Sequence, residues 1–102
     1  MDRRITINAV AFPEGETWVV QGIEYDIVAE ATSASKVAEA FARAIVETVC
    51  ISQELGREPL AGIGPAPEHY KELFEEAYAD IRTDVLPELP IAEMAIRLAE
   101  HA

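Results

Sequence analysis

A histidine and a glutamate stand three positions apart in the second half of the chain, with further carboxylates around them. The pair is His69 and Glu72, and Glu68, Glu75 and Glu76 lie in the same segment. Imidazole nitrogens and carboxylate oxygens bind divalent metals, but carboxylate–histidine sites take further ligands from other elements. We therefore interpret the segment as a solvent-exposed acidic face, and we predict neither a metal site nor a cofactor.

The single cysteine, Cys50, is a second candidate for chemistry. A nucleophilic cysteine needs a base beside it, and no histidine stands near Cys50 in the sequence. We predict a small packed residue instead. A lone cysteine excludes an internal disulfide and is typical of the reducing cytoplasm. No apolar run reaches the length of a membrane span or of a signal-peptide core, so we expect a soluble cytoplasmic protein.

The charge balance narrows the classes of partner. The chain has 102 residues, which suits a single domain over 1–102, and its formal net charge is −11. Eight basic residues spread along the chain cannot form the phosphate-binding surface of a nucleic-acid-binding protein, nor dock on an anionic membrane. Two interpretations of the charge remain open: it maintains solubility, or an acidic face covers a basic partner.

Alternating apolar residues predict three strands in the first third of the chain. Residues 4–12 and 17–23 form a hairpin across Pro13–Glu16, since proline and glycine favour a turn there. A third strand is expected over Tyr25–Ala31. Trp18 and Val20 are expected on one face of the sheet.

Helical periodicity predicts a long helix over residues 33–55, for which Thr32 and Ser33 offer an N-cap and Gly56 a C-terminal end. Its apolar sector is wider than three strands can cover, so we expect a homodimer. Residues 57–67 hold three prolines and two glycines and predict a loop. A second helix is expected over 68–81 and a short third one from 91 to about 100, with a short strand over 82–86 as the only other candidate. Prolines 87 and 90 interrupt the chain. The expected fold is α+β: a three-stranded antiparallel sheet (β-β-β-α) covered by the long helix, with one or two additional C-terminal helices.

The order strand, strand, long helix in TWVVQGIEYDIVAEATSASKVAEAF, residues 17–41, resembles the N-terminal domain of HicB-type antitoxins. The corresponding positions are Trp18–Val20, Glu24–Asp26, Ile27–Ala29 and Ser33–Ala40, and the resemblance covers about residues 3–55. It implies a partial ribonuclease H-like fold and a non-catalytic, protein-binding role. The implied partner is a small basic ribonuclease toxin, whose RNA-binding surface an acidic protein covers.

Ribonuclease H enzymes hold divalent metal ions with clustered carboxylates, which draws attention to Glu24, Asp26 and Glu30. The first strand, residues 4–12, lacks the acidic residue that the larger family keeps there, so we predict no nuclease activity. The candidate partner-binding residues are Trp18, Tyr25, Asp26 and Glu30. HicB-type domains usually carry a Pro-Gly pair before the third strand, which this chain lacks, and commonly add a fourth strand after the helix.

Full antitoxins of this family often end in a DNA-binding domain. Residues 68–102 carry nine acidic residues against three basic ones, so this segment is not expected to read DNA. The leading hypothesis is a HicB-like binding module, the alternative is a stand-alone structural or regulatory homodimer, and a metal-dependent nuclease is a remote third.

Overall fold

A hairpin begins the fold. The computed structural model describes residues 5–58, 60–82 and 91–101. β1 (Ile5–Glu14) and β2 (Thr17–Gly22) pair antiparallel, as expected, from Glu14 opposite Thr17 to Ala9 opposite Gly22. The turn between them places Gly15 at φ +62°, a conformation that glycine adopts without steric cost. The hydroxyl of Thr17 closes the turn by donating to the backbone carbonyl of Glu14 at 3.1 Å.

β3 (Val28–Ala31) follows a tight loop and pairs antiparallel with β2. It is shorter than the strand expected over 25–31, because the loop closes with a bond from the Gly22 N–H to the Ile27 carbonyl at 2.8 Å. A Cβ at Gly22 would clash with the carbonyl oxygen of Tyr25. Glycine at position 22 therefore lets the chain turn back this closely.

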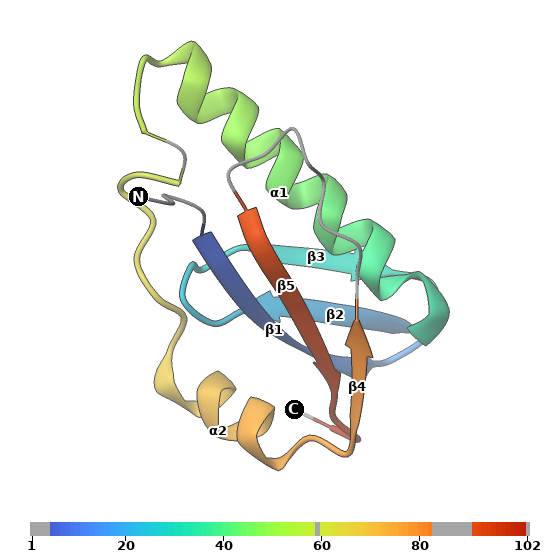
Figure 1. Cartoon of the computed structure of the whole chain (residues 1–102). Helices are drawn as coiled ribbons and strands as arrows, with labels where there is room; N and C mark the ends of the chain where they lie inside the picture. The colour runs from blue at the N-terminus through green and yellow to red at the C-terminus, as the bar shows by residue number, and fades with distance from the viewer. Residues whose placement is uncertain (1–4, 59, 83–90, 102) are drawn as a thin grey trace.

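The sheet has five strands rather than the three expected, and it is mixed rather than purely antiparallel. β4 (Ala79–Arg82) and β5 (Ile91–Leu98) complete the order β3-β2-β1-β5-β4. β5 lies parallel to β1, and β4 pairs antiparallel with β5 (Figure 1). The expected three-stranded sheet is therefore wrong.

The helix expected from residue 91 to about 100 is wrong for the same reason, since most of that segment is β5. Met94, Ile96 and Leu98 alternate along it and pack with the core beneath the long helix. The helix expected over 68–81 ends at Glu76, and the chain then enters β4. The short strand expected over 82–86 overlaps β4 only at residue 82. The rest of that segment and prolines 87 and 90 lie outside the described residues.

α1 (Val37–Glu54), preceded by the 3₁₀ turn η1 (Ala34–Lys36), covers one face of the sheet. The helix expected over 33–55 is thus largely confirmed, and Gly56 ends it at φ +69°. Ser33 precedes η1 and makes no capping bond through its side chain, and its hydroxyl pairs with that of Ser35 at 3.0 Å. The buried core on this face consists of Ile7, Ala9, Ala11, Val20, Ile27, Ala31, Val37, Phe41, Ile45, Val49, Leu60, Met94 and Ile96.

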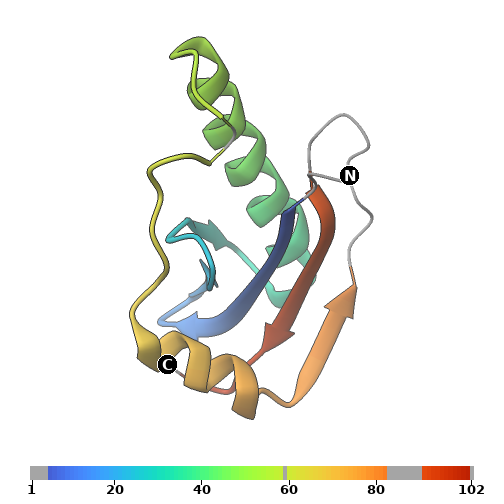
Figure 2. The same ribbon diagram turned by 60° about the vertical axis from the view of Figure 1, so that its left-hand side comes forward.

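α2 (Glu68–Glu76) lies on the opposite face of the sheet, near one end of β1 and β5 (Figure 2). Val10 and Phe12 of β1 point to this face, since they alternate with the residues that face α1. Tyr70, Leu73 and Phe74 of α2 pack against them. The loop expected over residues 57–67 is present in its described parts, 57–58 and 60–67. It is tied to the β2–β3 loop by bonds from the Asp26 N–H to the Gly64 carbonyl and from the Ala66 N–H to the Ile23 carbonyl.

Candidate functional site

β3 is an edge strand with one side open. Its neighbour on the paired side is β2. The Ile27 carbonyl accepts a hydrogen bond from Gly22 at the end of β2 and therefore points toward β2. In an antiparallel ladder, alternate residues direct their N–H and C=O groups to opposite sides of the strand. The backbone groups of Val28 and Glu30 therefore point away from β2. Among the described residues, none forms a hydrogen bond with these outward groups. An open row of this kind is a template for pairing with another strand.

A shallow hollow runs between this edge and the N-terminal half of α1. Its volume is about 270 Å³, and it is lined by Glu30, Ala31, Thr32, Lys36, Glu39, Ala40 and Arg43. Arg43 and Glu39 form an exposed ion pair one helical turn apart, with 3.3 Å between the guanidinium and the carboxylate. The lining of the hollow therefore combines small side chains with charges of both signs.

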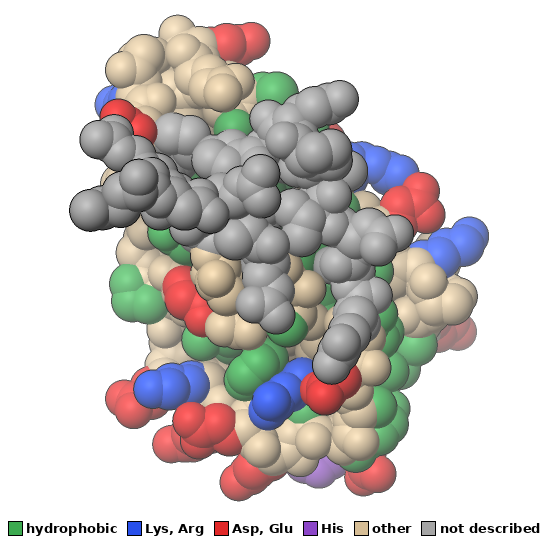
Figure 3. Space-filling model, in the orientation of Figure 1, with side chains coloured by type: hydrophobic (Ala, Val, Ile, Leu, Met, Phe, Trp, Pro, Cys, Tyr) green, Lys and Arg blue, Asp and Glu red, His purple; other side chains and the backbone are tan. Residues whose placement is uncertain are grey.

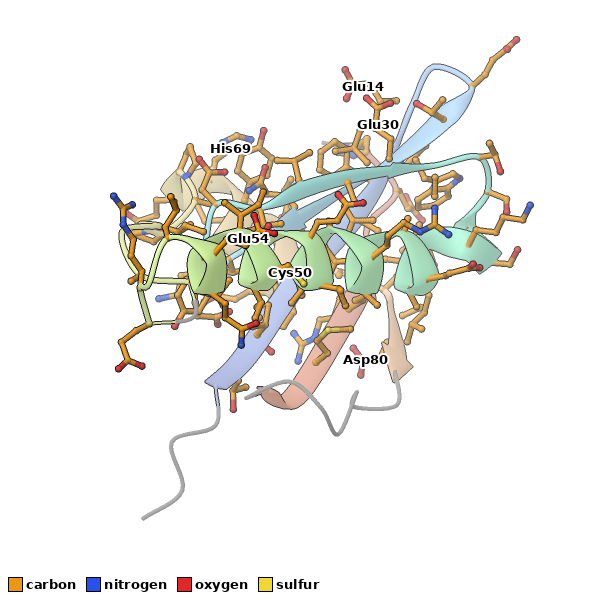
Figure 4. The ribbon with its side chains drawn as sticks, turned by 90° about the horizontal axis from the view of Figure 1, so that it is seen from above. Glu14, Glu30, Cys50, Glu54, His69 and Asp80 are labelled. Carbon is orange, nitrogen blue, oxygen red and sulfur yellow. The ribbon has the colours of Figure 1, made fainter. Side chains whose placement is uncertain are left out.

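The outer face beside the edge is acidic. Glu30 is paired with Val19 of β2, and the side chain of Val19 belongs to the cluster on the face of the sheet that α2 covers. Side chains of directly paired residues lie on the same face, so Glu30 also projects to the α2 face. Glu14 follows Phe12 by two positions on β1 and projects to the same face. Figure 4 shows Glu14 and Glu30 on one side of the ribbon and Asp80 on the other. By contrast, Figure 3 shows acidic and basic side chains intermixed over α2 and the ends of β4 and β5.

Two further carboxylates near β3 hold the β2–β3 loop in place. One oxygen of Asp26 accepts a hydrogen bond from the side-chain amide of Gln21 at 2.8 Å. The carboxylate of Glu24 accepts from the backbone N–H and from the side-chain amide of Asn8, both at 2.7 Å. Both carboxylates remain exposed at the surface, and they add negative charge while they fasten the loop to β1 and β2.

The four candidate partner-binding residues do not form one patch. Trp18 and Tyr25 are half-buried and pack against the core beneath α1. Glu30 projects to the opposite face, and Asp26 lies in the loop before β3. Of the four, Glu30 is the one that lines the hollow. Their role in partner binding stays a prediction.

The residues with catalytic or metal-binding chemistry are dispersed. His69 is exposed and contacts the ring of Tyr70, with 3.9 Å between ring centroids. Cys50 is exposed on α1, so its expected packing was wrong. Within the described ranges, no three side chains of His, Cys, Asp or Glu come together in a metal-binding group.

Sequence reasoning expected open sheet edges, but it did not locate one at β3 and did not find the hollow. The Glu39–Arg43 spacing was visible as a helical ion pair, but nothing local indicated that this pair would border a sheet edge. Val28 is 52% exposed, although it reads as an ordinary apolar strand residue. An apolar residue on the solvent side of a four-residue strand is the one signal that was present.

Comparison with known proteins yields no match among family models, curated proteins or solved structures. In the part of the chain that is described, none of the helices combines the length and the apolar character needed to cross a lipid bilayer.

Proposed function

We propose that this chain is a non-catalytic, HicB-like protein-binding module that neutralises a small basic ribonuclease toxin. The observation that carries the proposal is the open edge of β3, where Glu30 projects from the strand itself and Glu14 projects to the same face from β1, two strands further in. An edge of this kind offers hydrogen bonds to an incoming chain, and the surrounding charge selects a basic one.

The arrangement of strands adds support. HicB-type domains commonly carry a fourth strand after the long helix, and β5 follows α1 in the chain and lies beside β1. The inserted segment of α2 and β4 departs from the simple β-β-β-α-β order. The net charge of −11 also favours fast association with a basic protein, because opposite charges steer the encounter.

The direct test uses the reading frame next to the gene for this chain. If that frame encodes a small basic protein, its expression alone should arrest growth, and co-expression of this chain should restore it. The purified pair should co-elute, and RNA cleavage by the toxin should fall as this chain is added. A neighbouring product that neither binds this chain nor cleaves RNA would contradict the toxin assignment.

A stand-alone homodimer is the second candidate, and a specific observation favours it. Ile51 and Leu55 lie one turn apart at the end of α1 and are 58% and 61% exposed. Burial of this pair against a second copy would remove apolar surface from water. Light scattering should then give twice the chain mass of 11.2 kDa, and the double variant Ile51→Lys, Leu55→Lys should return it to the monomer mass. A monomer mass for the unmodified chain at high concentration would contradict the dimer.

A further inference from the structure

We propose that the partner docks by adding an extended, basic segment to the open edge of β3, so that its alternate side chains face the hollow and the acidic outer surface. The inference rests on the proposed function, because it names how that partner binds. It specifies one docking mode, which experiments can disprove while the toxin assignment still holds.

Backbone pairing supplies the first part of the argument. Val28 and Glu30 each direct one N–H and one C=O away from β2. An antiparallel segment opposite these residues can bond to all of these groups without disturbing the β2–β3 ladder. Main-chain hydrogen bonds give affinity in strand addition, and pockets for alternate side chains give specificity.

The two faces of the added strand would meet different surroundings. On the α1 side lies the hollow, whose lining includes Ala31 and Ala40 together with the charged Lys36, Glu39 and Arg43. Small or apolar side chains fit beside the two alanines, and the charges there, being of both signs, favour neither sign. On the outer face the segment would lie beside Glu30, where Lys or Arg gains an opposite charge. The sequence pattern that fits is therefore basic residues alternating with small apolar ones.

Charge also decides against a second copy of this chain as the occupant. Each copy carries a net charge of −11, and edge-to-edge pairing of two β3 strands would bring their acidic outer faces together. Like charges at such close range destabilise an interface. A basic segment gains from the same surface.

The probe is a synthetic peptide, acetyl-Lys-Val-Lys-Val-Lys-Thr-amide, titrated into the isotope-labelled full chain and followed by the NMR shifts of backbone amides. We expect the largest shifts at Val28 and Glu30, slowed hydrogen exchange of these two amides, and weaker binding as salt is raised. Two control peptides are matched to it: one has Glu in place of Lys, and the other has the same residues with the three lysines consecutive. Both should bind at least tenfold more weakly.

Three variants separate backbone pairing from charge. Val28→Pro removes an outward N–H at an edge position that tolerates proline, and it should abolish binding. Glu30→Lys should weaken binding about tenfold, because an attraction becomes a repulsion. Glu54→Lys makes the same change of charge at the exposed far end of α1 and should leave binding unchanged. Thermal unfolding of each variant verifies its fold, and Glu30→Lys remains informative if the proline variant does not fold.

Several outcomes would overturn the docking mode. These are the absence of peptide binding at millimolar concentration, shifts centred away from β3, equal binding of the matched control peptides, or a dimer that Val28→Pro converts to a monomer. If the toxin complex of the proposed function forms equally well with Val28→Pro, the partner assignment survives and strand addition does not.

Discussion

The two helices cover opposite faces of one sheet, but they bury their side chains to different degrees. Phe41, Ile45 and Val49 of α1 are inaccessible to solvent or nearly so. Tyr70, Leu73 and Phe74 of α2 are half-buried, and no side chain of α2, which is described throughout, is fully buried. The α1 face thus forms the main core, while α2 covers part of the other face. That partial cover leaves the outer surface of β3 free for a partner.

Removal of β5, on which both faces depend, should have the largest effect. A chain ended after Gly64 lacks α2, β4 and β5 and exposes the edge of β1 that β5 occupies. We expect this fragment to aggregate or to lose its cooperative thermal transition in circular dichroism. A fragment that stayed monomeric and melted near the temperature of the full chain would show that the residues after Gly64 are not needed for a stable fold. The difference between the two faces would then have no bearing on stability.

Matched aromatic truncations measure the difference between the faces directly. Phe41→Ala should lower the free energy of unfolding by about 3–5 kcal/mol, because a fully buried ring leaves a cavity. Phe74→Ala should cost about 1–2 kcal/mol, since its ring is only half-buried against the Val10 and Phe12 cluster and also contacts Arg97. Urea denaturation of both variants would test this, and equal losses would show that the α2 face is as much a core as the α1 face.

Gly22 links the α1 face to the loop before β3. A methyl group there would meet the Tyr25 carbonyl and approach the ring of Phe41 to 3.3 Å. We expect Gly22→Ala to destabilise the fold by about 1–3 kcal/mol, through overpacking. Gly15→Ala is the control, because nothing lies within 4 Å of a Cβ there and the cost comes from positive φ alone, about 1 kcal/mol. Chemical denaturation that ranked Gly15→Ala above Gly22→Ala would refute the steric argument.

Arg97 should have the smallest effect. Its guanidinium lies 4.2 Å from the centroid of the Phe74 ring, donates to the Phe74 carbonyl at 3.1 Å and pairs with Asp80 at 3.1 Å. Because the pair is partly exposed, Arg97→Gln should cost about 1 kcal/mol or less. Differential scanning calorimetry in low and high salt would test this, since the ion-pair part of the loss should shrink as salt is added. A loss as large as that of Phe41→Ala would place Arg97 in the core of the fold.

The first half of the chain followed its local patterns closely. Pro13–Glu16 specified a turn, and the apolar residues on either side of it paired as a hairpin. Apolar residues spaced at helical intervals specified α1, and Gly56 ended it. These signals act over a few residues, so they can be read without knowledge of the remaining chain.

Residues 91–98 show why local patterns did not predict the structure of the second half of the chain. Alanine, glutamate, methionine, arginine and leucine favour helices, and Ile91, Met94, Ala95 and Leu98 also fit a helical spacing. The alternation of Met94, Ile96 and Leu98 fits a strand equally well. The edge of β1 provides a ladder for this segment, and the parallel pairing joins residues more than 80 positions apart in the chain.

The candidate site depended on the same long-range assembly. The residues that line the hollow were present in the sequence as a helical ion pair and a few strand and loop residues, and the acidic surplus was evident from composition. These residues come together at an open edge because the strand order places β3 at one end of the sheet. The pairing of β3 with β2 then directs the backbone groups of Val28 and Glu30 outward. Local side-chain spacing specifies turns and helices because the interactions are short in sequence. Strand order is a property of distant pairings, whose free energy is gained only when the whole sheet assembles.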